Sequence, residues 1–594
     1  MRKVYNKIEF CDLKSCLMEA DRELIEDIKN RLEYLKTERG KREADWSEVQ
    51  KWVAPSVLKF TGTEKIPTRP KRFTSRPANY LKTLVSGITG YSISPNILWQ
   101  KLSLANTDLL DRYGVKDWLE AAERALYAEF ARSNLYAQVP KLIGDAATYG
   151  HGAMLIDEDV LNARLRFTTL RLPEFYLDIN EYDEVETVFR YFTMTLKNAV
   201  SFFGEDNLSE VTRQDYQDKK RWNNEINVIH AVFRRQEYDE EKQDQKNMPF
   251  ASVYIEDGQD HLIEESGYRD FPYAVFIWDK IIGTGYGESP AIHALDDIRL
   301  LNKTEEARLK VAQLAAEPPM NAPDTMRPEV EVVPRTGGAG VGGKAGRGRE
   351  LLAPGLVNYY DDPSLIMTPV NTGMNFPITI EVTDSIEARI RDWFNVDFFL
   401  MLQHQGAGRN QMTATEVMEL QGEKAAVLSD LVVNLNGALS RIVQRSFNIL
   451  WRQGKIPPPP DLVAQGGAGL KVDFIGPLAQ SQKKYHETGG IAQGLQIAGG
   501  IAQIAPAALD VVDFDEMMKT GIEGAGVNQR IIREAEDVAK IRQARAQAEA
   551  QAQQQAAAME QQKNILGNFN KLNEPLKPGT ALEAMGRQAA GGGA

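Results

Sequence analysis

Cysteine and histidine are scarce in this chain of 594 residues. Its two cysteines, Cys11 and Cys16, are separated by four residues, a spacing that fits no zinc-binding motif. The six histidines are scattered, and no two of them have the i, i+4 spacing of a helical zinc site. We therefore expect no metal site, no cofactor, and two idle thiols that suit a reducing cytoplasm.

Long apolar runs are missing as well. No stretch of 18 or more apolar residues occurs, so the sequence predicts no membrane-spanning helix. Its first residues lack the apolar core of a signal peptide, so we expect no secretory signal. The glycine-rich apolar patches around residues 487–506 come closest to a membrane-active segment, although charged residues border them. A protein that enters membranes through this segment stays as an alternative.

Positive charge is in deficit, because the formal net charge is −13 at pH 7. A protein that holds nucleic acid on a broad surface needs excess Lys and Arg to neutralise phosphates. The charge balance argues against such a surface but permits DNA to pass with weak contacts. Hydrophobic residues make up 43% and charged residues 26%, which is typical of a globular protein, and the length predicts several subdomains.

No catalytic motif is complete. Residues 338–344 copy the Gly-x4-Gly-Lys part of a phosphate-binding loop, but Ala345 replaces the hydroxyl residue that would bind Mg²⁺. The glycines at 283, 285 and 287 lack the dinucleotide-binding spacing and predict a turn. No Gly-x-Ser-x-Gly elbow occurs. We predict a protein that is not an enzyme, and a nucleotide-dependent enzyme resting on Lys344 is an alternative.

The first half of the chain predicts an α+β body. Apolar residues at helical spacing predict an amphipathic helix over 17–52, and the basic loop over 61–77 is either solvated or a subunit or DNA contact. Helices are also predicted over 78–88 and 115–149, and Trp118, Leu126 and Phe130 lie on the apolar stripe of the latter. Strands are predicted over 98–102, 153–157, 164–170, 187–195, 227–238, 252–256 and 273–278, antiparallel within 153–280.

Long helices dominate the second half. Ser289-Pro290 predicts the start of a helix that Pro318-Pro319 must end. Ile292, Leu295, Ile298 and Leu301 give this helix one narrow apolar seam, so it is expected to pack against similar helices. A region rich in Pro and Gly follows, with short β-like runs at 330–333 and 356–359 and a predicted mobile loop at 337–348.

Two further long helices follow, the first over about 378–402 and the next ending at Trp451, with a polar Gly-rich loop between them. The last 110 residues are rich in Ala, Gln and Gly; they predict a helix over 540–564 and a disordered end. The overall prediction is an α+β fold that is mainly α.

Residues around the Gly-rich loop resemble a known family. The stretch Met412-Thr-Ala-Thr-Glu-Val417 resembles part of the portal (head–tail connector) proteins of tailed bacteriophages, particularly the short-tailed, T7-like branch. Other stretches resemble the same family in the same order, and together they span about residues 70–480. They are Arg72-Phe-Thr-Ser-Arg76, residues 81–95, Tyr286-Gly-Glu-Ser-Pro290, Ala294-Leu-Asp-Asp-Ile298, Leu301-Asn-Lys303, Ala315-Ala-Glu-Pro-Pro319 and Phe474-Ile-Gly-Pro-Leu-Ala479.

The resemblance implies a portal-type subunit with an α+β wing, a long-helix stem, a small α/β clip and a helical crown. The stem is implied for 286–317 and 376–402, the clip for 318–375, and the tunnel loop for 403–412. Residues 1–285 form the N-terminal part of the wing, 413–480 a long helix and the rest of the wing, and 481–594 the crown and a partly disordered tail.

The resemblance also implies a ring of twelve copies at one capsid vertex, through which double-stranded DNA passes during packaging and ejection. Implied partners are the terminase large subunit, head–tail adaptor and tail proteins, and the capsid and scaffolding proteins. The implied location is the virion, after assembly in the host cytoplasm. A structural ring or scaffold component without a DNA channel is the alternative.

Two groups of residues are the candidate sites. The tunnel loop would present His404, Gln405, Arg409, Asn410 and Gln411 to passing DNA. The clip contains a basic group that either docks an acidic partner or is simply solvated. This group comprises Arg327, Arg335, Lys344, Arg347 and Arg349.

Overall fold

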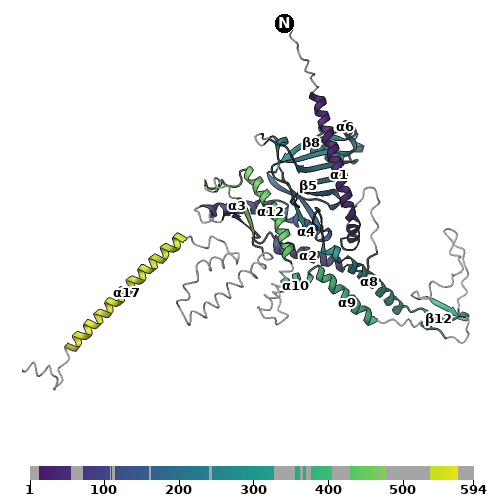
Figure 1. Ribbon diagram of the computed structural model, residues 1–594. Helices are drawn as coiled ribbons and strands as arrows, with labels where there is room; N and C mark the ends of the chain where they lie inside the picture. Colours follow the sequence, from purple (N-terminus) through teal and green to yellow (C-terminus); the bar gives the residue numbers. More distant parts are fainter. Residues whose placement is uncertain are drawn as a thin grey trace, which may run out of the picture. The chain divides into compact units, whose positions relative to one another are not determined.

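The structure, a computed structural model, describes most of the chain in two separate units, residues 1–507 and 508–594. The described residues are 13–54, 71–106, 109, 114–159, 162–239, 242, 244–326, 355–360, 366–369, 376–404, 428–461, 463, 469–476 and 535–572. The second unit is represented by one helix, α17 (Ala535–Leu572), which extends the helix predicted over 540–564 at both ends. The predicted fold class, α+β and mainly α, is confirmed (Figure 1).

A five-stranded antiparallel sheet forms one part of the first unit, with its strands in sequence order. Its strands are β4 (Phe175–Ile179), β5 (Val185–Thr195), β6 (Glu225–Arg234), β7 (Phe250–Glu256) and β8 (His261–Tyr268). The antiparallel strands predicted within 153–280 are therefore confirmed. Sequence analysis missed β4 and β8, because β4 is short and β8 is mostly polar, so neither shows clear alternation of apolar residues.

Helix α1 (Leu13–Trp52) runs along this sheet (Figure 1). Its apolar seam is buried as predicted, because Ile28, Leu32 and Leu35 are each at most 2% exposed. They pack in one cluster with residues of the sheet such as Phe189 and Ile229. The helix therefore forms one wall of this core.

Arg39 fixes α1 to the start of β4. Its side chain is only 2% exposed and donates hydrogen bonds to three backbone carbonyl oxygens, those of Leu172 (3.3 Å), Pro173 (3.0 Å) and Phe175 (2.9 Å). The Arg39 guanidinium also pairs with Glu43 at 2.7 Å. A buried backbone carbonyl needs a donor, so these hydrogen bonds help to satisfy the chain at the start of β4.

A second, three-stranded sheet lies within the largest hydrophobic core. Its order is β3 (Arg164–Thr169), β2 (His151–Asp159) and β9 (Tyr273–Ile277), all antiparallel. Several helices contribute to the same core, among them α2 (Arg76–Ser92), α3 (Val115–Arg132), α4 (Leu135–Tyr149) and α12 (Ser429–Arg452). The stripe predicted on α3, with Trp118, Leu126 and Phe130, is buried.

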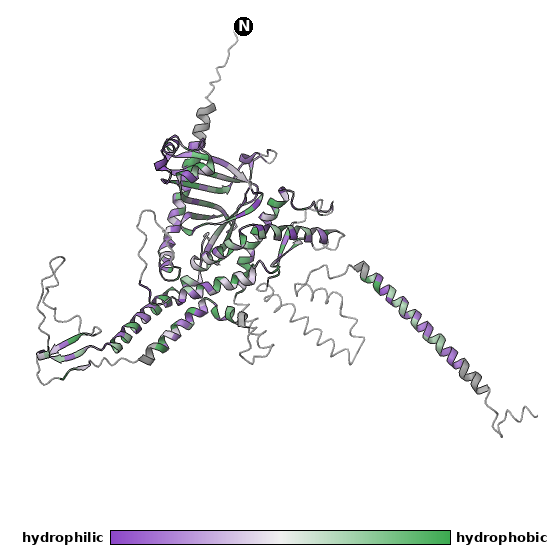
Figure 2. Ribbon diagram, turned by 180° about the vertical axis from the view of Figure 1, so that it is seen from behind, coloured by the Kyte–Doolittle hydropathy of each residue, from purple (hydrophilic) through white to green (hydrophobic). Residues whose placement is uncertain are grey.

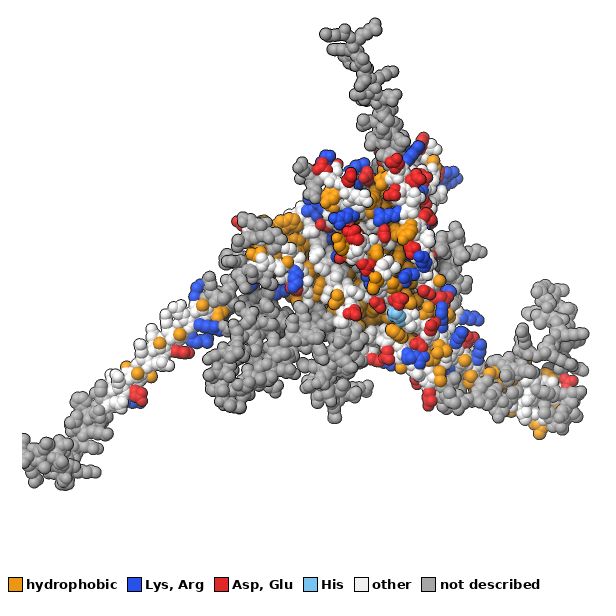
Figure 3. Space-filling view, viewed as in Figure 1, with side chains coloured by type: hydrophobic (Ala, Val, Ile, Leu, Met, Phe, Trp, Pro, Cys, Tyr) orange, Lys and Arg blue, Asp and Glu red, His pale blue; other side chains and the backbone are white. Residues whose placement is uncertain are grey.

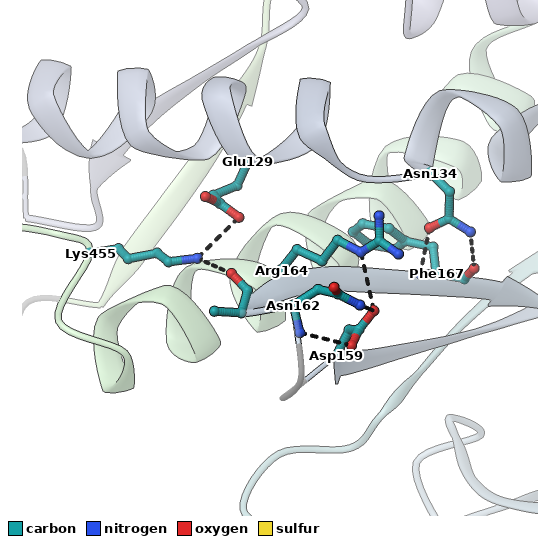
Figure 4. Close-up of polar contacts among 8 residues, drawn as sticks. Glu129, Asn134, Asp159, Asn162, Arg164, Phe167 and Lys455 are labelled. Carbon is teal, nitrogen blue, oxygen red and sulfur yellow. Dashed lines mark hydrogen bonds and ion pairs between the residues drawn. The ribbon is translucent and has the colours of Figure 1, made fainter. Parts of the chain in front are cut away.

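The helical region predicted over 115–149 is two helices rather than one. The chain leaves helical geometry at Ser133 and Asn134, and the Asn134 side chain turns to β3 instead. Its amide nitrogen donates to the Phe167 carbonyl at 2.7 Å, and its oxygen accepts from the Phe167 N–H at 2.9 Å (Figure 4). The side chain thus completes the hydrogen bonding of an edge strand, which explains the break.

Strands distant in sequence close the body. β1 (Gln100–Leu104) pairs antiparallel with β15 (Leu470–Phe474). Trp99 is fully buried beside this pair, with its ring stacked on Phe130 and on Phe474 at centroid distances of 5.9 and 6.4 Å. The segment between residues 104 and 470 therefore starts and ends at the same end of this strand pair.

We expect Arg39→Met to destabilise the body by about 3 kcal/mol, because it leaves three buried carbonyls without their donor while preserving side-chain volume. Chemical unfolding followed by circular dichroism measures the change. Arg22→Met, at an exposed position of the same helix, is the matched control and should be nearly neutral. Equal stability of the two variants would contradict the role of Arg39.

A second prediction concerns pH. Burial raises the pKa of Asp145 on α4 to about 7, an effect that Lys141 only partly offsets. The folded chain therefore binds a proton more readily than the unfolded chain, and stability falls as pH rises from about 4 to about 7. Asp145→Asn should match the wild type at pH 4 and exceed its stability by about 2 kcal/mol at pH 8. Unfolding curves at pH 4, 6 and 8 check this, and a constant difference across that range would refute it.

Candidate functional site

Two helices extend away from the body side by side, and we call them the helical arm. They are α8 (Leu295–Ala316) and α9 (Phe376–Trp393), and both views show them leading to a small sheet (Figures 1 and 2). In that sheet, β12 (Met320–Pro323) pairs parallel with β13 (Val357–Tyr360) and antiparallel with β14 (Thr368–Pro369). The arm is therefore an antiparallel helix pair capped by a three-stranded sheet.

The arm begins at a well-defined turn. The Gly-rich segment forms the turn that was predicted, between β10 (Asp279–Lys280) and β11 (Gly287–Glu288). Ser289 then caps a short helix, α7 (Pro290–His293): its hydroxyl accepts from the Ile292 N–H at 3.1 Å and donates to the Thr148 carbonyl at 2.8 Å. The helix predicted from Ser289-Pro290 thus begins as expected but is interrupted at Ala294 before α8 starts.

Burial decreases along α8. Leu295, Ile298 and Leu301 are buried, which confirms their place in the predicted seam, and they pack in one core with Ile386 and Ile390 of α9. Beyond Asn302, no described side chain of α8 is buried. Apolar residues nevertheless continue outward with large exposed fractions: Leu309 (47%), Ile380 (39%) and Val382 (46%). The outer part of the arm thus exposes apolar side chains that no described part of the chain covers.

Charged residues occupy most of the remaining arm surface, and Figure 2 shows hydrophilic and hydrophobic residues alternating along both helices. Asp297 on α8 pairs with Arg389 on α9 at 2.7 Å, which joins the two helices. Glu306 and Lys310 pair at 2.8 Å within α8, at the i, i+4 spacing that favours such pairs. Pairs of this kind keep the arm polar without giving it a strong charge of one sign.

The chain breaks helical geometry at Asn395, where φ is +48°. The helix predicted over 378–402 is therefore wrong as a single element, because α9 ends at Trp393 and α10 (Val396–His404) begins after the break. Asparagine is one of the few non-glycine residues that tolerate this left-handed conformation, and it commonly ends helices. The break redirects the chain toward the body.

Close contact with α2 anchors α10. Phe399 is 1% exposed, and its ring lies against Gly87 of α2, where a β-carbon would be only 2.3 Å from the Phe399 Cδ1 atom. Tyr91, one turn along α2, stacks on the same ring at 6.4 Å. Only glycine at position 87 lets the two helices approach this closely.

Polar contacts anchor α12 on the other side of the Gly-rich loop. Arg445 is buried and donates to the backbone carbonyls of Ile156 and Asp270, both at 2.8 Å. Just past the helix end, Lys455 donates to the Ala163 carbonyl at 2.6 Å and pairs with Glu129 at 3.2 Å (Figure 4). In the sequence, residues 405–427 therefore lie between two helices that are each fixed to the body.

The predicted site residues themselves lie largely outside the described residues. His404 ends α10, but its side chain and residues 405–411, with Gln405, Arg409, Asn410 and Gln411, are outside. The same holds for the basic group at Arg327, Arg335, Lys344, Arg347 and Arg349, and for the glycine-rich match at 338–344. These site assignments stay predictions. Sequence analysis missed the anchoring residues Gly87, Asn395 and Arg445. The one available signal was Gly87, because a glycine inside a helical pattern can indicate close packing.

Among the described residues, no group of three or more His, Cys, Asp or Glu side chains could hold a metal ion. Burial lowers the pKa of His151 and of His230 to about 3, so both are neutral core residues at neutral pH. In the described helices, none is long and apolar enough to cross a membrane. Figure 3 shows basic and acidic side chains interspersed over the visible face of the body.

Comparison with known proteins gives concordant matches over most of the chain. Residues 26–532 match the family described as "Bacteriophage head to tail connecting protein". The chain is 30% identical over 539 residues to the portal protein of Salmonella phage epsilon15, covering 88% of this chain and 91% of that protein. It is 28% identical over 523 residues to the probable portal protein of Bordetella phage BPP-1, covering 86% and 89% respectively.

We expect Gly87→Ala to destabilise the packing of α10 on α2 by about 2 kcal/mol, because the added methyl group would overlap the Phe399 ring. Gly90→Ala on the same helix is the matched control: no atom lies within 4 Å of its added methyl group, so it should stabilise by about 0.5 kcal/mol. Differential scanning calorimetry measures both, and Phe399→Leu should partly rescue Gly87→Ala. Equal effects of the two glycine substitutions would contradict the close contact.

Proposed function

Because the chain belongs to the family of bacteriophage head to tail connecting proteins, we propose that it is the portal protein at one vertex of a phage capsid. The family resemblance predicted from residues 70–480 is confirmed. The short-tailed, T7-like type is not tested by these relatives and stays a prediction. In the proposed role, twelve copies form a ring, and double-stranded DNA passes through its channel during packaging and ejection.

The helical arm is the observation that supports assembly into a ring. Its outer part buries no α8 side chain within the described chain, yet it carries Leu309, Ile380 and Val382 with large exposed fractions. Apolar side chains on an extended helix pair are stabilised when similar helices cover them, which a ring of identical arms would provide. A closed ring repeats one such contact around its axis.

The proposed division of the subunit follows the family. Residues 1–285 and 413–480 form the wing, 286–317 and 376–402 the stem, and 318–375 the clip. Residues 403–412 form the tunnel loop, and 481–594 form the crown and a partly disordered tail. The antiparallel helix pair and its small terminal sheet support the stem and clip, and the separate α17 supports the crown.

Weak contact with DNA suits this chain. The net charge of −13 and the mixed charges on the visible face of the body offer no broad surface for phosphate binding (Figure 3). The tunnel loop would therefore supply the contacts, chiefly through Arg409, with His404, Gln405, Asn410 and Gln411 as polar neighbours. The helix that leads into this loop, α10, is anchored on α2, and α12, which follows later in the chain, is anchored on the body.

Partners are proposed by the same reasoning. The clip would meet the terminase large subunit during packaging and head–tail adaptor or tail proteins afterwards, with the basic group from Arg327 to Arg349 as a docking surface. Capsid and scaffolding proteins would contact the ring in the virion, after assembly in the host cytoplasm. Because the motor supplies energy, the portal itself is not an enzyme; nucleotide binding that Lys344→Ala abolishes would contradict this.

Native mass spectrometry and cryo-electron microscopy of the purified protein test the ring. We expect particles near twelve copies of the 66.5-kDa chain, about 798 kDa, with an open central channel lined by residues 403–412. Particles without a channel, at concentrations that permit assembly, would contradict the proposal. They would favour a structural or scaffold component that conducts no DNA.

Arg409→Ala tests the tunnel loop. We expect a few-fold loss of packaged or retained DNA, because each ring would lose one phosphate contact for every subunit. Arg409→Lys keeps the positive charge and should retain most of the function. Nuclease protection of DNA in assembled particles measures both variants, and unchanged packaging and retention in Arg409→Ala would remove this role.

A further inference from the structure

Ion pairing leaves one cation of α8 without a partner. Within the described part of the chain, every other charged residue of this helix belongs to an ion pair, but Lys303 forms none. The pairs are Asp296–Arg299, Asp297–Arg389, Arg299–Glu48, Glu305–Arg308 and Glu306–Lys310. On α9, the described carboxylates without an ion pair are Glu381, Asp384 and Asp392. Each helix thus keeps unpaired charge of one sign.

These unpaired charges lie on the faces of the arm that point away from its internal seam. Lys303 is five residues from Ile298 on α8, about 140° around the helix from that buried residue. Asp384 is two residues from Ile386 on α9, about 160° around from it. Both side chains are exposed. Because each lies opposite the contact between α8 and α9, the two charges are on opposite sides of the arm.

Each of these two charged residues lies between one large and one small apolar residue on the same face of its helix. Leu300 (47% exposed) and Ala307 lie one turn to either side of Lys303. Ile380 (39% exposed) and Ala388 lie one turn to either side of Asp384. Each face therefore carries a large apolar residue, a charge and a small residue in a row.

The ion pair between Asp297 and Arg389 sets the antiparallel register of the two rows. Lys303 is six residues beyond Asp297, and Asp384 is five residues before Arg389, which are about 9 and 7.5 Å along the arm. Lys303 and Asp384 are thus level with each other. In the same register, Leu300 is nearly level with Ala388, and Ala307 with Ile380.

We propose that the arms of adjacent copies pack through these two faces, with Lys303 of one copy paired to Asp384 of the next. Leu300 then packs beside Ala388, and Ile380 beside Ala307. The proposed contact places the arms parallel to the ring axis. A rotation about that axis leaves height along it unchanged, so residues that are level along one arm then meet across the contact. Opposite faces make the contact head-to-tail, as a closed ring requires. The inference rests on the proposed ring and identifies the second copy of the chain as the partner of both faces.

A charge-reversal cycle tests the pairing. Lys303→Glu and Asp384→Lys each place like charges together, so each should raise the concentration at which half the protein is in rings by roughly tenfold. The double variant Lys303→Glu/Asp384→Lys restores attraction with the signs exchanged and should assemble near the wild-type concentration. Lys82→Glu, at an exposed lysine of α2, is the control for net charge and should assemble like the wild type.

Cross-linking tests the geometry independently. Chains carrying Lys303→Cys and chains carrying Asp384→Cys, both with Cys11 and Cys16 changed to Ser, are co-expressed with different tags and oxidised. We expect a disulfide between the two kinds of chain, and none when Lys82→Cys replaces Lys303→Cys.

The outcomes separate this inference from the ring itself. Rings that form normally in both single variants, without the cross-link, would overturn the pairing and leave the portal function standing. A wild-type chain that forms no ring under any condition would overturn both.

Discussion

Hydrogen bonds from buried arginines to backbone carbonyls hold the long helices to the sheets, and the remaining architecture depends on them. Arg39 joins α1 to the start of β4, and Arg445 joins α12 to the three-stranded sheet. Arginine suits this task because its planar group carries five donors and stays charged at any pH the protein meets. A buried guanidinium that lost these acceptors would be very unfavourable, so each helix has one strongly preferred position.

The subunit therefore has two parts, which differ in how far they bury their apolar side chains. The described body buries its apolar residues in four clusters, and α10 and α12, which precede and follow residues 405–427 in the chain, are both fixed to it. The helical arm does not cover its apolar residues, since its outer part buries little within one chain. A body with its own core and an arm with exposed apolar side chains are expected of a subunit whose arm is covered by neighbouring copies, as proposed above.

Sequence periodicity predicted much of the helical structure. The seam of α1, the stripe of α3 and the start of α7 after Ser289 were predicted correctly, because local spacing and capping determine them. The breaks were not predicted, since Asn134 turns to β3 and Asn395 adopts a left-handed conformation only in the folded chain. The anchoring contacts could not be predicted from the sequence either. Gly87 contacts Phe399, and Arg445 binds the Ile156 carbonyl, and each pair is separated by hundreds of residues in the chain. The pattern of glycines between two predicted helices identified the candidate loop, and the family resemblance supplied its predicted role.

The antiparallel arm has a consequence for how such proteins can diverge. Helices α8 and α9 leave and re-enter the body side by side, so equal insertions into both would lengthen the arm without disturbing the body. Seven added residues on each helix preserve the faces almost unchanged and move the small sheet outward by about 10.5 Å. The length of the arm can therefore change in discrete steps while the body stays the same.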